Sequence, residues 1–172
     1  ANTLMLDLMR SNKDVLNLPE TTHPDQDVAW EESISNNRKS LASAATIIVD
    51  SWYIEDDSLV VDFSVINHVG HKLPSGYPSR IAWLQVLLTD QDSGDTLYFN
   101  GKMDSEGHII GRDLPFEPHH EICRAETDVQ IYEMVMSNMH GQVTTRLNAA
   151  FEPVKDNRLL PRGFRLNHPV YD

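Results

Sequence analysis

Histidines are the residues of this sequence best suited to metal or redox chemistry, and two short stretches hold pairs of them. His68 and His71 lie three positions apart, and His119 and His120 are adjacent. If the two stretches meet at one end of the fold, their imidazoles and the carboxylates of Glu-Pro-His-His-Glu are enough to ligate zinc or copper. Their spacing matches no standard metal motif, so the alternative is that they lie at opposite ends of the fold.

The stretch 67–80 is a second candidate site, because it combines backbone-restricting residues with polar side chains. Its glycines and prolines leave the backbone few conformations, so that the side chains are presented from a rigid base. The polar residues in question are His68, His71, Lys72, Tyr77 and Arg80. The alternative is that this stretch only connects one sheet with another.

Other chemistries leave no recognisable pattern, which favours a protein without catalytic activity. There is no GxSxG, no HExxH and no Cys–His signature. The acidic stretch 90–95 lacks the glycine and the glutamate that an EF-hand requires at its sixth and twelfth positions, so we interpret it as a hairpin turn. Cys123 is the only cysteine, which excludes an internal disulfide; without a CxxCH motif, this chain cannot attach haem covalently.

Alternation of apolar and polar residues predicts that most of the chain is β. Helical spacing predicts helices over 3–18 and 27–45, with a linker at 19–26. Period-two patterns then predict strands, and turn residues separate them. The predicted strands are 46–54, 59–67, 81–89, 96–100, 122–126, 128–136 and 143–151.

The predicted fold is mainly β: an antiparallel β-sandwich of immunoglobulin-like architecture, preceded by two N-terminal helices. Helices followed by uninterrupted strands indicate segregated layers rather than βαβ units. We therefore expect a helical linker segment at 1–45 and a β-sandwich domain at 46–172. The predicted core consists of Leu59, Val61, Phe63, Val65, Leu84, Val86 and Leu88.

Charge and hydropathy limit the partners that we expect. The 172 residues carry a net charge of −12, which argues against non-specific nucleic-acid binding. No apolar run approaches the roughly 20 residues that a membrane-spanning helix needs, and no signal peptide is recognisable.

Three stretches resemble the haem-free C-terminal β domain of bacterial multihaem c-type cytochromes. The first runs from Asn67 to Trp83. The second combines 117–122 with 129–133, and the third combines 144–147 with 155–164. The opening helix at 4–18 resembles the link between the haem domain and the terminal β domain of that family.

The resemblance implies a periplasmic or extracellular electron-transfer protein, with haem c in an N-terminal part that is absent here. It implies that His71 is an axial iron ligand. The alternative is that the loop only packs the sandwich against the haem domain, with His71 hydrogen-bonded inside its own loop. His68, His119 and His120 are weaker candidates for binding a metal. It further implies that Lys72 and Arg80 face haem propionates and that Tyr77 lies nearby. The expected partners are the haem-bearing domain of the same polypeptide or other redox proteins. The alternative function is a free-standing extracytoplasmic β-sandwich module that binds a metal ion or a protein.

Overall fold

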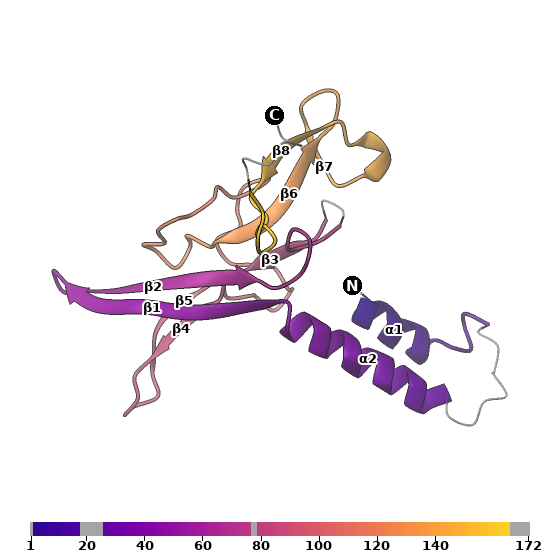
Figure 1. Cartoon of the computed structure of the whole chain (residues 1–172), viewed down its shortest axis with the longest axis horizontal. Helices are drawn as coiled ribbons and strands as arrows, with labels where there is room; N and C mark the ends of the chain where they lie inside the picture. The colour runs from indigo at the N-terminus through magenta and orange to yellow at the C-terminus, as the bar shows by residue number, and fades with distance from the viewer. Residues whose placement is uncertain (1, 18–25, 77–78, 166–172) are drawn as a thin grey trace. The chain divides into compact units, whose positions relative to one another are not determined.

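The computed structural model describes residues 2–17, 26–76 and 79–165. The chain is mainly β, with two helices at the N-terminus and antiparallel sheets, as the sequence predicts (Figure 1). By its internal contacts it divides into a first unit, Ala1–Val69, and a second unit, Gly70–Asp172. The predicted domain boundary between residues 45 and 46 stays a prediction.

Two helices open the first unit and run side by side in opposite directions (Figure 1). They are α1 (Asn2–Ser11) and α2 (Gln26–Ala42). The ion pairs Arg10–Glu31 at 2.7 Å and Lys13–Asp27 at 2.6 Å join them, and Ile34 is buried. α1 ends well before the predicted residue 18, which itself lies outside the described residues. Neither of these helices, in the part of the chain that is described, is long and apolar enough to cross a membrane.

A long antiparallel hairpin forms the rest of the first unit, from β1 (Ala45–Glu55) and β2 (Ser58–Asn67). A bulge between Val49 and Ser51 leaves Asp50 without a partner in the ladder. This extra residue explains why the alternation of β1 changes phase in the sequence. Because the bulge absorbs one position, the apolar residues before and after it lie on the same face. That face, called here the apolar hairpin face, consists of Ile47, Val49, Trp52, Ile54, Leu59, Val61, Phe63 and Val65.

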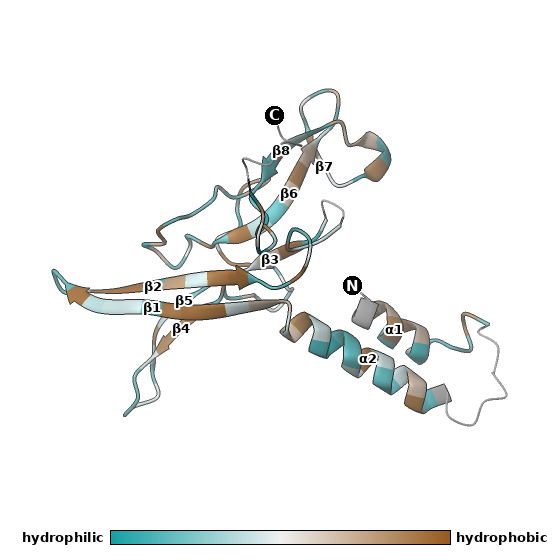
Figure 2. Cartoon of the chain, viewed as in Figure 1, coloured by the Kyte–Doolittle hydropathy of each residue, from teal (hydrophilic) through white to brown (hydrophobic). Residues whose placement is uncertain are grey.

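The apolar hairpin face is not a buried core, so the predicted core is wrong. Leu59 is 44% exposed and Val61 38% exposed, while Phe63 and Val65 are half-buried. The predicted residues from 84 to 88 are half-buried or exposed as well. The physical reason is that a two-stranded hairpin is a single layer, and no other described element of the first unit packs on it. Figure 2 shows how much of both strands is hydrophobic.

The second unit is organised around β6 (Ile131–Ser137), whose residues are almost all buried. β6 pairs with three antiparallel partners, and a separate two-stranded sheet lies in the same unit. The partners of β6 are β3 (Ile81–Trp83), β7 (Val143–Thr144) and β8 (Glu152–Asp156); the separate sheet consists of β4 (Val86–Thr89) and β5 (Thr96–Asn100). The core is the cluster of Ile109, Val129 and Ile131, against which Ile81 and Trp83 pack.

The predicted strand 81–89 is divided between two sheets. Its first part, β3, pairs with β6, and its second part, β4, pairs with β5. Between them, Trp83 Nε1 and Gln85 Nε2 both donate to the carbonyl oxygen of Gly101, at 3.0 and 2.9 Å. Gly101 has φ +72° and its Cα approaches the Leu84 carbonyl so closely that no side chain fits. This contact lets one extended segment change sheets, which hydropathy alone does not reveal.

One other predicted strand is absent, and another is mostly absent. No strand forms at 122–126, where the Asp128 carboxylate accepts the N–H groups of Arg124 and Ala125. The buried amide of Asn100 donates to the carbonyls of Glu126 and Asp128 and fastens this turn. In 143–151, only β7 is a strand, and a 3-10 turn follows at Leu147–Ala149.

Candidate functional site

The loop from Gly70 to Arg80 is anchored to the segment that ends β8 and follows it. Leu73 exchanges two backbone hydrogen bonds of 2.9 Å with Leu159. Lys72 Nζ lies 2.7 Å from the Asp156 carboxylate, which also receives both ends of the Arg158 guanidinium, at 2.8 and 2.9 Å. The loop is therefore held at its base by backbone pairing and by charge.

The Asp156 carboxylate is the electrostatic centre of this anchor. The hydrogen bonds from Arg158, and after them the one from Lys72, hold the pKa of Asp156 well below its usual range despite the partial burial that opposes this shift. Two cations share one carboxylate, so the anchor keeps one net positive charge. The structure thus places Lys72 in an ion pair at the base of the loop.

His71 has its imidazole hydrogen-bonded within the loop, with Nδ1 3.0 Å from the backbone oxygen of Lys72. A carbonyl oxygen can only accept, so Nδ1 carries the proton. In the neutral ring the lone pair is then on Nε2. This is the tautomer that metal-ligating histidines adopt when they donate their other N–H to a backbone carbonyl.

Arg80 closes the loop on itself, since its guanidinium donates to the Ser75 carbonyl at 3.1 Å. A Cβ built on Gly76 would lie 2.9 Å from the same guanidinium, and Gly76 has φ +85°. The positive φ favours glycine at this position, whereas the flexible Arg80 side chain could move away from an added Cβ. Tyr77, the remaining predicted haem-contact residue, lies outside the described residues.

His119 is held by two side-chain amides. Gln130 Nε2 lies 2.7 Å and Asn157 Nδ2 3.1 Å from His119 Nδ1. Both amides are oriented by the backbone, because Gln130 Oε1 accepts the N–H of His120 and Asn157 Oδ1 accepts the N–H of Glu133. The amide nitrogens must therefore face His119, whose Nδ1 accepts from both and whose Nε2 carries the proton.

The histidines do not form a metal centre in the described part of the chain. No group of three or more histidine, cysteine, aspartate or glutamate side chains there is arranged to hold an ion. His119 has the proton on Nε2, opposite to what ligation through that atom requires. His68 belongs to the first unit, where its Nε2 lies 2.8 Å from the Thr46 hydroxyl. His120 is fixed through its backbone N–H.

A buried ion pair in β6 and β8 escaped the sequence analysis. The Glu133 side chain is 3% exposed and the Lys155 side chain 8% exposed, and 2.9 Å separates Lys155 Nζ from the carboxylate. Arg112 lies at 3.6 Å from the other carboxylate oxygen, with its side chain 38% exposed. The sequence gives one indication of this ion pair, namely that Glu133 is a single charged residue within an otherwise uncharged strand.

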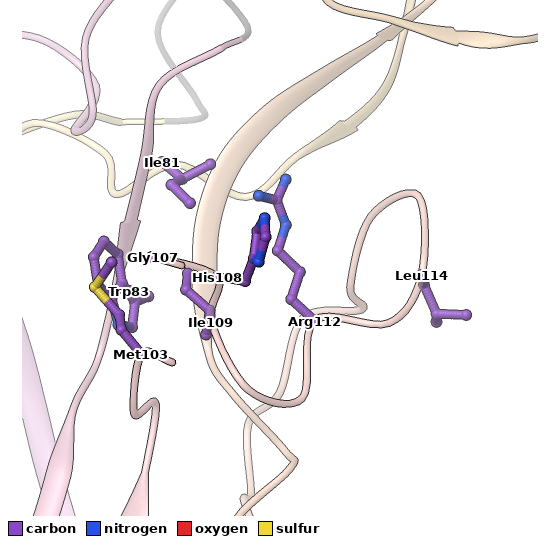
Figure 3. A pocket seen from close by; sticks show the side chains of 8 residues that line it. All are labelled: Ile81, Trp83, Met103, Gly107, His108, Ile109, Arg112 and Leu114. Atoms are coloured by element: carbon purple, nitrogen blue, oxygen red, sulfur yellow. The ribbon is translucent and has the colours of Figure 1, made fainter. Parts of the chain in front are cut away.

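A pocket of about 400 Å³ lies beside this ion pair, wholly within the second unit (Figure 3). Its apolar walls come from β3 and from the small hairpin in which Met103 and Ile109 form a bridge. Arg112 and His108 supply its charged or polar groups. The lining residues are Ile81, Trp83, Met103, Gly107, His108, Ile109, Arg112 and Leu114.

Comparisons with known proteins place the chain in no family: no family model, no curated protein and no solved structure matches it.

Proposed function

We propose that this chain is the haem-free C-terminal domain of a bacterial multihaem c-type cytochrome, acting in electron transfer without catalysing a reaction itself. The haem-bearing part of the same polypeptide, or other redox proteins, would be its partner, in the periplasm or outside the cell. Haem c in that part carries the electrons. The chain described here packs on the haem domain and offers His71 to it.

The observation that carries this proposal is the hydrogen bond of His71. Its Nδ1–H donates to the Lys72 carbonyl, so in the neutral ring the lone pair is on Nε2, the atom through which such a histidine ligates a metal. The side chain is exposed, and the loop beneath it is fixed by the Leu73–Leu159 bridge. A preformed loop lowers the entropy cost of ligation, because it need not be ordered on binding.

The positions of the resembling stretches add support, because residues from all three contact one another within the second unit. The loop contacts the third stretch through Leu73–Leu159 and Lys72–Asp156. The second stretch contacts it through His119 and Asn157. The surplus positive charge of the Lys72–Asp156–Arg158 cluster suits the carboxylates of haem propionates near the loop.

We also propose that the antiparallel sheets form a β-sandwich of immunoglobulin-like architecture. The apolar hairpin face supports this, because Trp52 and Ile54 are 69% and 72% exposed on it. A strand pair with one apolar and one polar face is stable in water only when a second layer covers the apolar side.

The test is a redox titration of the intact cytochrome with His71→Ala. One haem should shift in reduction potential and in its absorption spectrum, because the axial ligand is a main determinant of both. The matched control is His119→Ala, which removes an imidazole of the opposite tautomer and should leave every haem unchanged.

A second measurement separates ligation from structural support. The same His71→Ala change should lower the melting temperature of the isolated chain very little, since the side chain is exposed and its Nδ1 hydrogen bond is to the backbone of its own loop. Unchanged potentials together with a strongly lowered melting temperature would show that His71 only supports the loop. An encoding reading frame without any CxxCH motif would refute the cytochrome assignment itself.

The alternative is a free-standing extracytoplasmic binding module. One observation favours it, namely the pocket beside Arg112, whose walls are complete within the second unit. A module of this kind needs no haem-bearing partner.

A further inference from the structure

We propose that the pocket between β3 and the segment 103–114 binds a small organic acid with an apolar body, whose carboxylate pairs with Arg112. This ligand requires no haem, so the inference stands or falls independently of the proposed cytochrome function. It rests on an unbalanced charge next to an apolar cavity.

Among the described residues, Glu133 is the carboxylate that forms an ion pair with Arg112. Its side chain is 3% exposed, and Lys155, almost equally buried, already neutralises it at 2.9 Å. Arg112 is the second cation on the same carboxylate, and it is the one that reaches the pocket. The cluster therefore keeps one positive charge on its solvent-accessible side, where an anion can balance it.

Arg112 also has donors to offer. Among the described residues its guanidinium forms no hydrogen bond, and its ion-pair distance to Glu133 is 3.6 Å. A guanidinium can bind a carboxylate through two parallel hydrogen bonds, the strongest polar contact available to such a ligand. His108 also lines the pocket, but its Nδ1 already lies 3.4 Å from the Asp104 carboxylate and 3.7 Å from the Glu106 carboxylate. We therefore expect the carboxylate of the ligand to bind Arg112 rather than His108.

The remaining walls determine the body of the ligand. Ile81, Trp83 and Ile109 line the pocket and belong to the core of the unit or pack against it. Figure 3 shows the side chains of Arg112 and His108 beside each other, with Ile81 and Ile109 next to them. The volume of about 400 Å³ is within the usual range of small-molecule sites, roughly 300–1,000 Å³. An aromatic or branched aliphatic acid meets both requirements.

Arg112 is held in place by the backbone before it. Its N–H donates to the Ile109 carbonyl at 3.1 Å. Gly111, with φ +90°, lies so close to Thr127 that a Cβ there would be 2.5 Å from the Thr127 carbonyl oxygen. The guanidinium is thus presented from a fixed turn rather than from a free loop end.

The experiment is an NMR titration of the whole chain with benzoate, with benzamide as the neutral probe of the same shape. The indole N–H of Trp83 and the Nε–H of Arg112 should shift saturably with benzoate. Benzamide should bind about tenfold more weakly or worse, because it lacks the charge-assisted hydrogen bonds.

Variants complete the test. Arg112→Gln should lose about tenfold or more in benzoate affinity, whereas Arg112→Lys should recover part of it and the exposed Arg146→Gln should change nothing. Arg112→Gln should remain folded, because Glu133 keeps Lys155. The proposal is overturned if Trp83 shows no saturable shift, if benzoate and benzamide bind equally, or if Arg112→Gln binds benzoate like the unmodified chain.

Discussion

His71 and His119 show how local hydrogen bonds select different tautomers of the same side chain. His71 donates through Nδ1 to a carbonyl, and His119 accepts through Nδ1 from two amides. We expect ¹⁵N spectra at about pH 8.5, above the ordinary imidazole pKa of about 6.5, to show the Nδ1–H tautomer for His71 and the Nε2–H tautomer for His119. Nε2–H at His71 would remove the main support for iron ligation.

The buried ion pair gives a second prediction at this scale. Lys155→Met should lower the free energy of unfolding by about 3–5 kcal/mol, because Glu133 then keeps a buried charge whose remaining partner, Arg112, is more distant and more exposed. Arg112→Gln should cost much less, since the close pair stays intact. Urea denaturation of both variants measures the difference.

The matched control replaces both partners. Glu133→Met with Lys155→Met removes the charges together, and such replacements are often neutral or stabilising by about 1–4 kcal/mol. If Lys155→Met alone is as stable as the double variant, the Glu133 side chain is not a buried charge. The free energies of unfolding can be compared only if all variants have the same secondary structure, which far-ultraviolet circular dichroism checks.

At the scale of elements, two glycines allow the stability cost of a steric clash to be measured separately from that of backbone strain. Gly94→Ala adds a side chain at φ +75° in open space and should cost about 1–2 kcal/mol. Gly111→Ala has similar strain and also meets the Thr127 backbone, so it should cost about 1–3 kcal/mol more. Equal losses in thermal unfolding would mean that the turn before Arg112 is not tightly packed.

The sequence predicts elements well where one pattern extends over a whole strand. β2 and β5 match their predicted ranges within one residue, because hydrophobic alternation and the turns that follow agree there. Side-chain hydrogen bonds explain the failure at 122–126, where Asp128 and Asn100 bend an apparently extended segment. In the sequence, the bulge at Asp50 is visible only as a break in the alternation of apolar and polar residues in β1.

The candidate site could be predicted in part. The loop 67–80 stands out by composition, and the structure shows Lys72 and Arg80 in contacts that hold the described part of it. Its contact with Asp156 and Leu159 could not be predicted, since nothing local relates segments so distant in sequence. The same limit hid the pairing of Glu133 with Lys155, which becomes visible only when β6 and β8 are adjacent.

At the scale of the whole molecule, acid should act on the anchor around Asp156. The pKa of Asp156 is lowered in the folded chain, first by Arg158 and then by Lys72. A lowered folded-state pKa contributes stability above the unfolded-state value of about 3.9, and this contribution is lost as pH falls below it.

The Asp156→Asn variant isolates this effect from the other carboxylates. It should be less stable than the unmodified chain near neutral pH, and the difference in free energy of unfolding should narrow as pH falls below about 4. Denaturant unfolding at a series of pH values measures it. A difference that stays constant down to the lowest pH would mean that Asp156 is not held by these cations.

The antiparallel bridge between Leu73 and Leu159 has a consequence for the order in which the chain can fold during synthesis. The helix pair and the β1–β2 hairpin of the first unit use contacts between neighbours in sequence, which close fast. The loop that carries His71 depends on partners such as Asp156, 84 positions downstream of Lys72. During synthesis the first unit has all its own residues before residue 70 appears. The contacts that anchor the His71 loop can form only after residues 156–159 have left the ribosome, so their formation would report that nearly all of the second unit has been made.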